Sequence, residues 1–97
     1  MLIQINVGGI DVTFGEPLAP NKPEPFYPYL ESVEPITDAT GEETGSAGFS
    51  LSLKAQRLIE LNVRRSVKIL DDDLSLVFEG IIGRIAYKNA IDITVEA

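Results

Sequence analysis

Residues 67–95 read VKILDDDLSLVFEGIIGRIAYKNAIDITV, a stretch in which apolar and polar side chains alternate between short groups of turn residues. Successive side chains of a strand point to opposite faces, so an alternating run can bury one face and hydrate the other. The stretch therefore predicts consecutive antiparallel strands, with turns at residues 71–73 and 89–90 and a bulge or bend at Gly80 and Gly83. The expected strands are residues 67–70, 74–78, 81–87 and 91–95.

The N-terminal half of the chain adds further strands. Two alternating runs flank Gly8 and Gly9, which predicts a tight hairpin because both central residues of such a turn need a positive φ. Shorter alternating runs predict an edge strand near residues 30–35 and another strand at residues 49–53.

Residues 55–62 fit two patterns. Their apolar side chains suit one or two helical turns, and they also alternate as a strand would; we favour a helical turn that leads into a strand from Val63. Residues 1–97 are thus expected to form a single domain that is all-β, or mainly β with one short helix. Its predicted architecture is an antiparallel β-barrel or sandwich of about seven strands.

Two segments are predicted to be connections. Residues 15–28 contain five of the six prolines in the chain, which excludes helix and central strand and predicts an extended arm, partly polyproline II, pinned to the sheet by aromatic side chains. Residues 37–48 are polar, acidic and glycine-rich, which predicts a flexible loop.

The composition excludes several kinds of chemistry. The chain has no histidine and no cysteine, so it lacks the usual general base, thiolate nucleophiles and the commonest zinc ligands. Asp71, Asp72 and Asp73 do not follow the spacing of a calcium-binding loop and are interpreted as a solvated turn. We therefore expect a protein that is not an enzyme, with no metal and no cofactor.

The net charge of −7 is unevenly distributed. Residues 1–53 carry one basic and eight acidic residues, whereas residues 54–97 carry seven of each. This balance disfavours nucleic-acid binding; it suits head-to-tail contacts between copies, although solubility alone would also explain it. The chain shows neither a signal peptide nor an apolar run of about 20 residues, so we expect no membrane association.

Two groups of residues are candidate partner contacts. Residues 15–28 show PxxP spacing, which is compatible with an SH3 or WW ligand, a stiff linker, or an arm that reaches a neighbouring subunit. A pair of arginines could bind phosphate or carboxylate, although in a strand the two would face opposite sides and simple surface charge is the plainer interpretation. The candidates are Pro20, Pro23, Pro25, Phe26, Tyr27, Tyr29, Arg64 and Arg65.

Four segments carry a family resemblance: GFSLSL at 48–53, VKI at 67–69, FEGIIGRI at 78–85 and IDITVEA at 91–97. In this order they resemble the β-barrel domains of bacteriophage tail hub and baseplate proteins and of related injection machines. The resemblance covers about half of the chain, residues 48–97. It implies a structural protein of a virion or phage-like particle assembled in the bacterial cytoplasm, which works in a ring or stack through self-association or docking to other tail proteins.

A second hypothesis is a small β-barrel module that binds carbohydrate or peptide. Tyr27, Tyr29 and Tyr87 would supply the aromatic surface for such a ligand. The chain has no tryptophan, and aromatic residues make up only 7% of it, which makes the structural hypothesis the preferred one.

Overall fold

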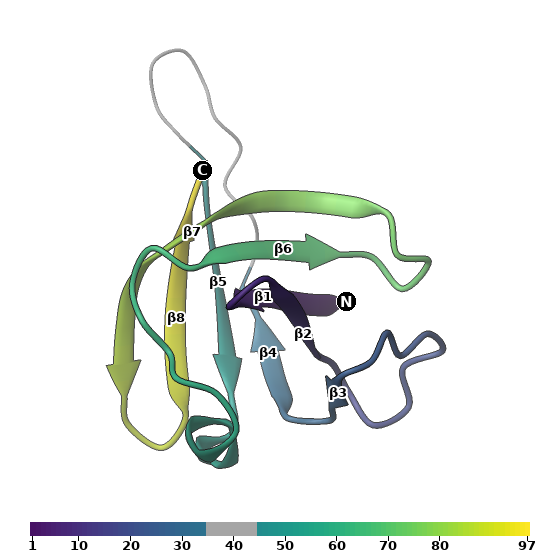
Figure 1. Cartoon of the computed structure of the whole chain (residues 1–97), viewed down its shortest axis with the longest axis horizontal. Helices are drawn as coiled ribbons and strands as arrows, with labels where there is room; N and C mark the ends of the chain where they lie inside the picture. Colours follow the sequence, from purple (N-terminus) through teal and green to yellow (C-terminus); the bar gives the residue numbers. More distant parts are fainter. Residues whose placement is uncertain (35–44) are drawn as a thin grey trace.

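The computed structural model describes residues 1–34 and 45–97 and shows a mainly β protein built on one eight-stranded sheet (Figure 1). Within these residues one short 3-10 helix, η1 (Leu53–Arg57), follows the fifth strand. All strand pairs are antiparallel except the two-residue parallel pair of β2 and β3. The strands are β1 (Leu2–Val7), β2 (Ile10–Phe14), β3 (Phe26–Tyr27), β4 (Leu30–Val33), β5 (Ser46–Leu51), β6 (Ser66–Leu70), β7 (Leu76–Tyr87) and β8 (Ile91–Glu96). This confirms the predicted fold class, mainly β with one short helix, but with eight strands in one sheet instead of about seven in a barrel or sandwich.

The sheet is curled, with the strand order β3-β2-β1-β6-β7-β8-β5-β4. Its two edge strands, β3 and β4, follow each other in the sequence and are separated only by Pro28 and Tyr29. One backbone hydrogen bond, from the Leu30 N–H to the Gly15 carbonyl at 3.3 Å, joins the start of β4 to the residue that follows β2. No ladder joins these two edges in the described part of the chain, so the structure is one open, rolled sheet rather than a closed barrel or two separate sheets.

Strand β7 turns the corner of the sheet. Its first half pairs with β6 and its second half with β8, the change of partner falling at Ile81. Figure 1 shows β6 running across the direction of β5 and β8, as in orthogonal β-packing, where bent or bulged strands make the corners. Residues 74–78 and 81–87 were expected to be two strands, but the structure has one. The predicted bulge is present, because the register with β8 shifts between Ile82 and Arg84.

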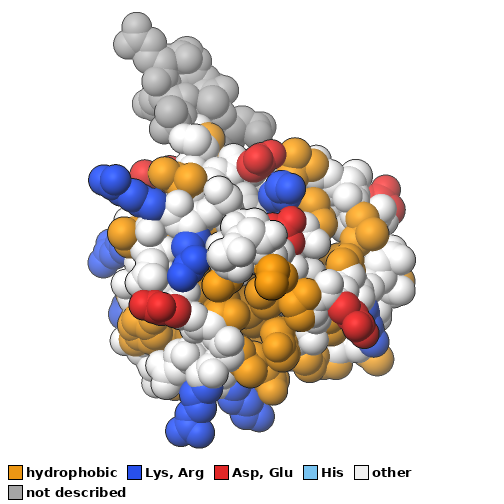
Figure 2. Space-filling view, in the orientation of Figure 1, with side chains coloured by type: hydrophobic (Ala, Val, Ile, Leu, Met, Phe, Trp, Pro, Cys, Tyr) orange, Lys and Arg blue, Asp and Glu red, His pale blue; other side chains and the backbone are white. Residues whose placement is uncertain are grey.

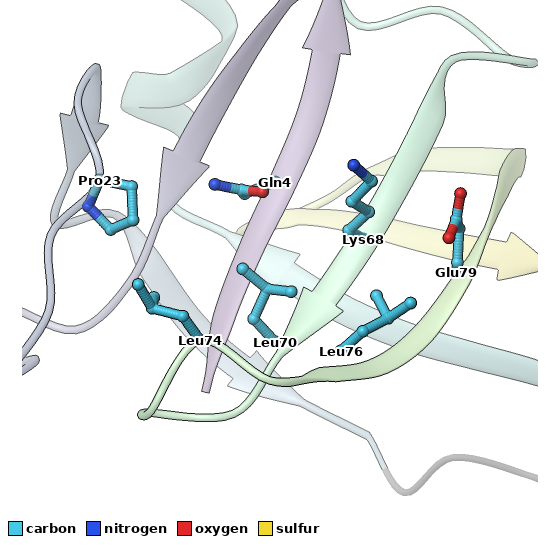
Figure 3. Close-up of a pocket in the computed structure, with 7 residues that line it drawn as sticks. All are labelled: Gln4, Pro23, Lys68, Leu70, Leu74, Leu76 and Glu79. Carbon is cyan, nitrogen blue, oxygen red and sulfur yellow. The ribbon is translucent and has the colours of Figure 1, made fainter.

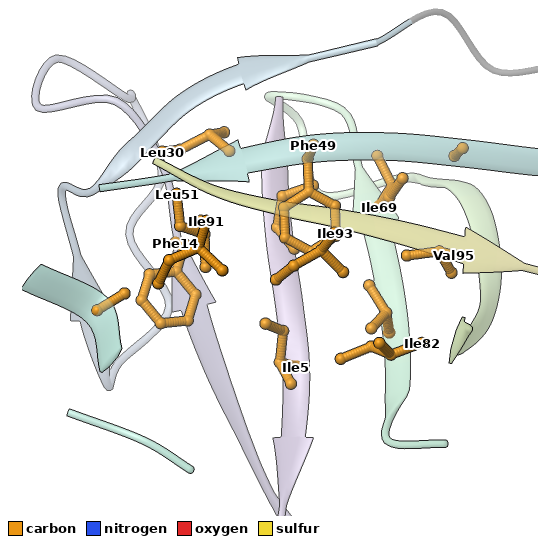
Figure 4. Packing of buried hydrophobic residues seen from close by; sticks show 14 of the residues in the cluster. Ile5, Phe14, Leu30, Phe49, Leu51, Ile69, Ile82, Ile91, Ile93 and Val95 are labelled. Atoms are coloured by element: carbon orange, nitrogen blue, oxygen red, sulfur yellow. The ribbon is translucent and has the colours of Figure 1, made fainter. Parts of the chain in front are cut away.

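The hydrophobic core lies inside the curl of the sheet (Figure 4). Strand β8 shows the predicted alternation most clearly, since Ile91, Ile93 and Val95 are buried while the residues between them are exposed. Phe49 of β5 lies opposite Ile93 in the ladder and is also fully buried. The period-two pattern of the sequence therefore assigns the buried face of β8 correctly.

The hairpin of β1 and β2 forms where the sequence predicts it. Gly8 and Gly9 have φ angles of +61° and +88°, as the two central residues of a type I′ turn require. The Gly9 N–H donates to the Asn6 side-chain oxygen at 3.2 Å. The edge strand expected near residues 30–35 is β4.

Two sequence-based boundaries are wrong. Strand β5 begins at Ser46, within the predicted flexible loop, and buries Ala47 and Gly48; residues 37–44 of that loop lie outside the described residues. The strand expected from Val63 begins instead at Ser66, because Arg64 has a φ of +72° and interrupts the extended backbone. No helix in the described ranges is long and apolar enough to cross a membrane.

Candidate interaction surface

The proline-rich arm pairs with the edge of its own sheet at β2 and lies close to Leu2 on the outer face. The Thr13 N–H donates to the Pro25 carbonyl at 2.8 Å, and the Gly15 N–H donates to the Tyr27 carbonyl at 3.2 Å. A Cβ placed on Gly15 would lie 2.6 Å from the Leu2 side chain and 2.9 Å from the Phe26 ring. The arm thus covers Leu2, which is fully buried although it faces away from the main core.

The arm is also attached to the turn between β6 and β7. The Asn21 Nδ2 donates to the Asp72 carbonyl at 2.6 Å, and the Lys22 Nζ lies 5.9 Å from the Phe26 ring centroid. Of the predicted contact residues, Pro20 and Pro25 are exposed, whereas Pro23 and Phe26 are half-buried. In the described residues the arm therefore contacts its own chain along much of its length.

A groove lies beside the arm on the outer face of β1, β6 and β7 (Figure 3). Its volume is about 490 Å³, and its apolar end is formed by four side chains from the arm and the β6–β7 hairpin. We call it the outer-face groove; it is lined by Gln4, Pro23, Lys68, Leu70, Leu74, Leu76 and Glu79. It continues into a polar hollow of about 350 Å³ that shares Gln4, Lys68 and Glu79.

The polar side chains of the groove are linked by a long ion pair and a hydrogen bond. The Lys68 Nζ lies 3.9 Å from the Asp11 Oδ2, and the Asn6 Nδ2 donates to the Asp11 Oδ1 at 3.0 Å. Glu79 is directly opposite Lys68 in the ladder. All eight basic residues of the chain lie in the described part, and none forms an ion pair with Glu79. Such an open and hydrated set of groups suits reversible binding more than bond-breaking chemistry.

The β6–β7 hairpin carries the apolar rim of this groove. Leu74, Leu76 and Val77 are 42%, 54% and 41% exposed. The exposure of these side chains follows from a shift in the register between β6 and β7. Ile69 pairs with Phe78, but the next residue, Leu70, pairs with Leu76. Val77 is therefore an extra residue in β7. A bulge of this kind turns neighbouring side chains away from strict alternation. The alternating pattern did not predict this rim; the signal that could have indicated it is the unbroken apolar run at residues 76–78.

The aspartates of the adjoining turn bind the backbone and side chains around them. The Asp73 Oδ1 accepts hydrogen bonds from the Ser75 Oγ at 2.6 Å and the Ser75 N–H at 3.0 Å. These bonds, the side-chain one first, hold the pKa of the Asp73 carboxyl below its usual range. The Asp72 Oδ1 lies 2.9 Å from the Met1 amino group. In the described part of the chain no three acidic side chains converge as metal ligands.

The tyrosines fall into two separate places. Tyr27 and Tyr29 stack with ring centroids 6.2 Å apart, and Tyr27 lies 5.9 Å from the Phe14 ring. Tyr87 is the last residue of β7, whereas Tyr29 directly precedes β4. Strands β8 and β5 lie between β7 and β4 in the sheet, so Tyr87 is far from Tyr29. The structure thus brings together two of the three tyrosines.

Tyr29 also lines a second hollow, of about 390 Å³, beside the 3-10 helix. We call it the η1 hollow; it is lined by Tyr29, Leu53, Lys54, Gln56, Arg57 and Leu58. The Lys54 Nζ lies 5.9 Å from the Tyr29 ring centroid. The Ser52 Oγ accepts a hydrogen bond from the Lys54 N–H at 3.3 Å and so caps η1.

The paired arginines do not lie in a strand, so the expectation that they face opposite sides of one is wrong. The Arg64 N–H donates to the Ile82 carbonyl at 2.7 Å, and the Arg65 carbonyl accepts from the Ile82 N–H at 3.0 Å. The Arg65 Nε donates to the Glu60 carbonyl at 2.8 Å. Both arginines precede β6, whereas the arm lies beside its end at Leu70, so the two predicted contact groups do not form one site.

Comparison with known proteins does not add to this description. No family model, no curated protein and no solved structure matches the chain.

Proposed function

We propose that this chain is a non-enzymatic structural domain that binds other protein chains within a phage tail or phage-like particle. Its partners are copies of itself or other tail proteins, and the particle assembles in the bacterial cytoplasm. The observation that carries the proposal is the exposed apolar rim of Leu74 and Leu76 on the outer-face groove, together with the exposed Val77 that follows Leu76 in β7.

Exposed apolar side chains are common singly, but a group of them around a groove is typical of an interaction site. The rim is held in place by its turn, because the Asp71 N–H donates to the Ser75 carbonyl and the Leu74 N–H to the Asp71 carbonyl, both at 2.9 Å. A preformed rim loses less conformational entropy on binding than a mobile one. Figure 2 shows a further broad hydrophobic area bordered by charged residues on one face of the molecule, in the region where Figure 1 places β1 to β4 and not at the β6–β7 turn.

The assignment to a tail particle rests on the resemblance of residues 48–97. Those residues form η1 and the strands β5 to β8, which include the corner strand and the rim. An architecture whose sheet ends in open edges also suits a protein that repeats in an assembly, because unpaired strand edges and apolar rims both favour contact with further chains.

Static and dynamic light scattering at near-neutral pH tests the proposal. We expect a mass above that of the 10.6 kDa chain that grows with concentration, or a complex with the products of neighbouring tail-tube or tape-measure genes. A chain that stays monomeric at millimolar concentration and ignores those partners would contradict the proposal.

A second candidate function is a ligand-binding module, which the stacked pair of Tyr27 and Tyr29 favours. Aromatic faces beside a hollow suit the apolar face of a sugar or a peptide side chain. A glycan array and a chemical-shift titration separate the two candidates. Saturable shifts confined to Tyr27, Tyr29 and the η1 hollow would favour the module, and their absence would leave the structural role.

A further inference from the structure

The η1 hollow has the opposite charge to the chain as a whole. Its cations are Lys54 and Arg57, and none of the described residues that line it is acidic, although the chain has a net charge of −7. Leu53 and Leu58, which are 38% and 39% exposed, add apolar surface. Figure 2 shows basic side chains projecting at the end of the molecule where Figure 1 places η1. A segment that is both acidic and apolar would match this surface.

The chain itself carries such a segment. Residues 71–77, which we call the hairpin tip, read DDDLSLV. The three aspartates are exposed, and they adjoin the exposed side chains of Leu74, Leu76 and Val77. The tip thus presents acidic and apolar groups in one short turn, as the η1 hollow presents basic and apolar ones.

The two surfaces lie apart on the molecule. Figure 1 shows η1 at its lower end and the turn between β6 and β7 at its right side. No hydrogen bond or ion pair joins residues 71–77 to residues 53–58 within the described chain. One copy therefore does not fill its own hollow with its own tip.

We propose that the hairpin tip of one copy binds the η1 hollow of a second copy. This inference rests on the proposed function and names the contact through which the chain self-associates. The aspartates of the tip face Lys54 and Arg57, while Leu74 and Leu76 cover Leu53 and Leu58. The contact is heterologous, so a bound pair keeps a free hollow on one copy and a free tip on the other, and repetition gives a ring or a stack.

Charge also argues against the symmetric alternatives. Two tips brought together would oppose six carboxylates, of which only the two of Asp72 have a cation beside them, the Met1 amino group, and two hollows would oppose four cations. Like charges across a contact are unfavourable, and they are most unfavourable where water is excluded. Unlike surfaces therefore pair in preference to identical ones, which is the condition for a head-to-tail assembly.

Two charge-reversed variants test the contact by sedimentation velocity. Lys54→Glu/Arg57→Glu makes both surfaces acidic, and Asp71→Lys/Asp73→Lys makes both basic. We expect each variant alone to associate at least about tenfold more weakly than the wild type. An equimolar mixture should regain association, because the acidic tip of the first variant meets the basic hollow of the second.

The matched control is Arg84→Glu/Lys88→Glu, which alters the net charge as much as the first variant does but lies on β7 and the turn after it. It should associate as the wild type does. Because Asp73 supports its own turn, Leu76→Ser provides a second test of the tip: its side chain is 54% exposed, so the fold should persist, checked by circular dichroism, while association weakens.

The outcomes separate the two proposals. A wild type that associates while the variants do so unchanged, or a mixture that fails to regain association, overturns the tip-and-hollow contact and leaves the proposed function standing. A control that loses as much as the hollow variant also overturns the contact, because net charge would then explain the loss. A wild type that is monomeric at millimolar concentration overturns the contact and removes self-association from the proposed function.

Discussion

Gly80 decides how closely β7 and β8 approach each other. A Cβ on Gly80 would collide with the backbone carbonyl oxygen of Glu96, whereas a Cβ on Gly83 would meet only the end of the Glu96 side chain, 2.8 Å away. A backbone carbonyl in a ladder cannot swing aside, but a carboxylate on a flexible side chain can. The two glycines of the corner strand therefore differ in kind, although they stand three residues apart.

This difference predicts unequal effects of alanine at the two positions. Gly80→Ala should destabilise the fold by roughly 1–3 kcal/mol, as overpacking at a rigid contact does. Gly83→Ala, the matched control, should stay within about 1 kcal/mol of the wild type, because Glu96 can move and the alanine restricts the unfolded chain. Chemical denaturation measures both free energies of unfolding, and equal losses would show that the Glu96 backbone does not limit Gly80.

Asp73 and Ser75 make a second prediction at the scale of single residues. Ser75→Ala removes the hydroxyl that donates to the Asp73 Oδ1, so the pKa of Asp73 should rise toward its usual value. In the wild type the pKa of this carboxyl is lowered on folding. Its contribution to stability is therefore present above the pKa of the unfolded chain and is lost as the pH falls through the lower, folded value. A carbon-detected NMR titration measures the pKa, and an unchanged value would contradict the role of the hydroxyl.

Among the elements, the arm is the least obvious from the sequence. Its prolines predict an extended connection, and the structure shows a turn closed by the bond from the Ala19 N–H to the Glu16 carbonyl and the two-residue strand β3 within that segment. They do not predict that Phe26 covers Leu2, because Leu2 belongs to the alternating polar positions of β1. A strand pattern separates two faces but does not say whether the outer one is covered.

The arm should therefore loosen when Phe26 is truncated. In Phe26→Ala, hydrogen exchange at the Thr13 and Gly15 amides should accelerate, since both donate to carbonyls of the arm, while the amides of β8 keep their protection. Leu18→Ala is the control, because Leu18 is 92% exposed and should change nothing. Uniform acceleration throughout the sheet would instead show that Phe26 supports the whole core.

The sequence predicts the strands well, but it predicts less well where one strand ends and the next begins. Strand β8 alternates without a fault, and its prediction needed only the period-two rule. Gly80 and Gly83 were correctly interpreted as a bulge or bend, but whether a bend also breaks a strand depends on partners elsewhere in the chain. Here β6 holds one half of β7 and β8 the other, and no local pattern contains that information.

At the scale of the whole molecule, the residues that the structure describes share one core, which predicts one unfolding transition. The core cluster draws residues from β1, β2 and β4 to β8, on both sides of the corner strand. Calorimetric and van't Hoff enthalpies should therefore agree, with a heat-capacity change of about 1.2–1.5 kcal/mol/K. Two separate transitions would mean that the two halves of the rolled sheet fold independently.

The candidate surfaces show what the sequence could not provide. Pro23 and Tyr29 were predicted contacts and do line hollows, but Arg64 and Arg65 lie elsewhere, and Leu74, Leu76 and Lys54 were not considered. Apolar residues in a strand pattern are assigned to the core by default. Only the shifted register at Leu70 and Leu76 turns this part of the hairpin outward, and registers depend on the fold as a whole.

Amide NMR spectra over a dilution series, from millimolar to about ten micromolar, test most directly whether this chain self-associates. We predict concentration-dependent shifts at residues 53–58 and 71–77 together, with little change at the exposed positions of β8. Spectra that do not change with concentration, or shifts that fall only on other surfaces, would contradict the assembly that we derive from the rim, the hollow and their charges.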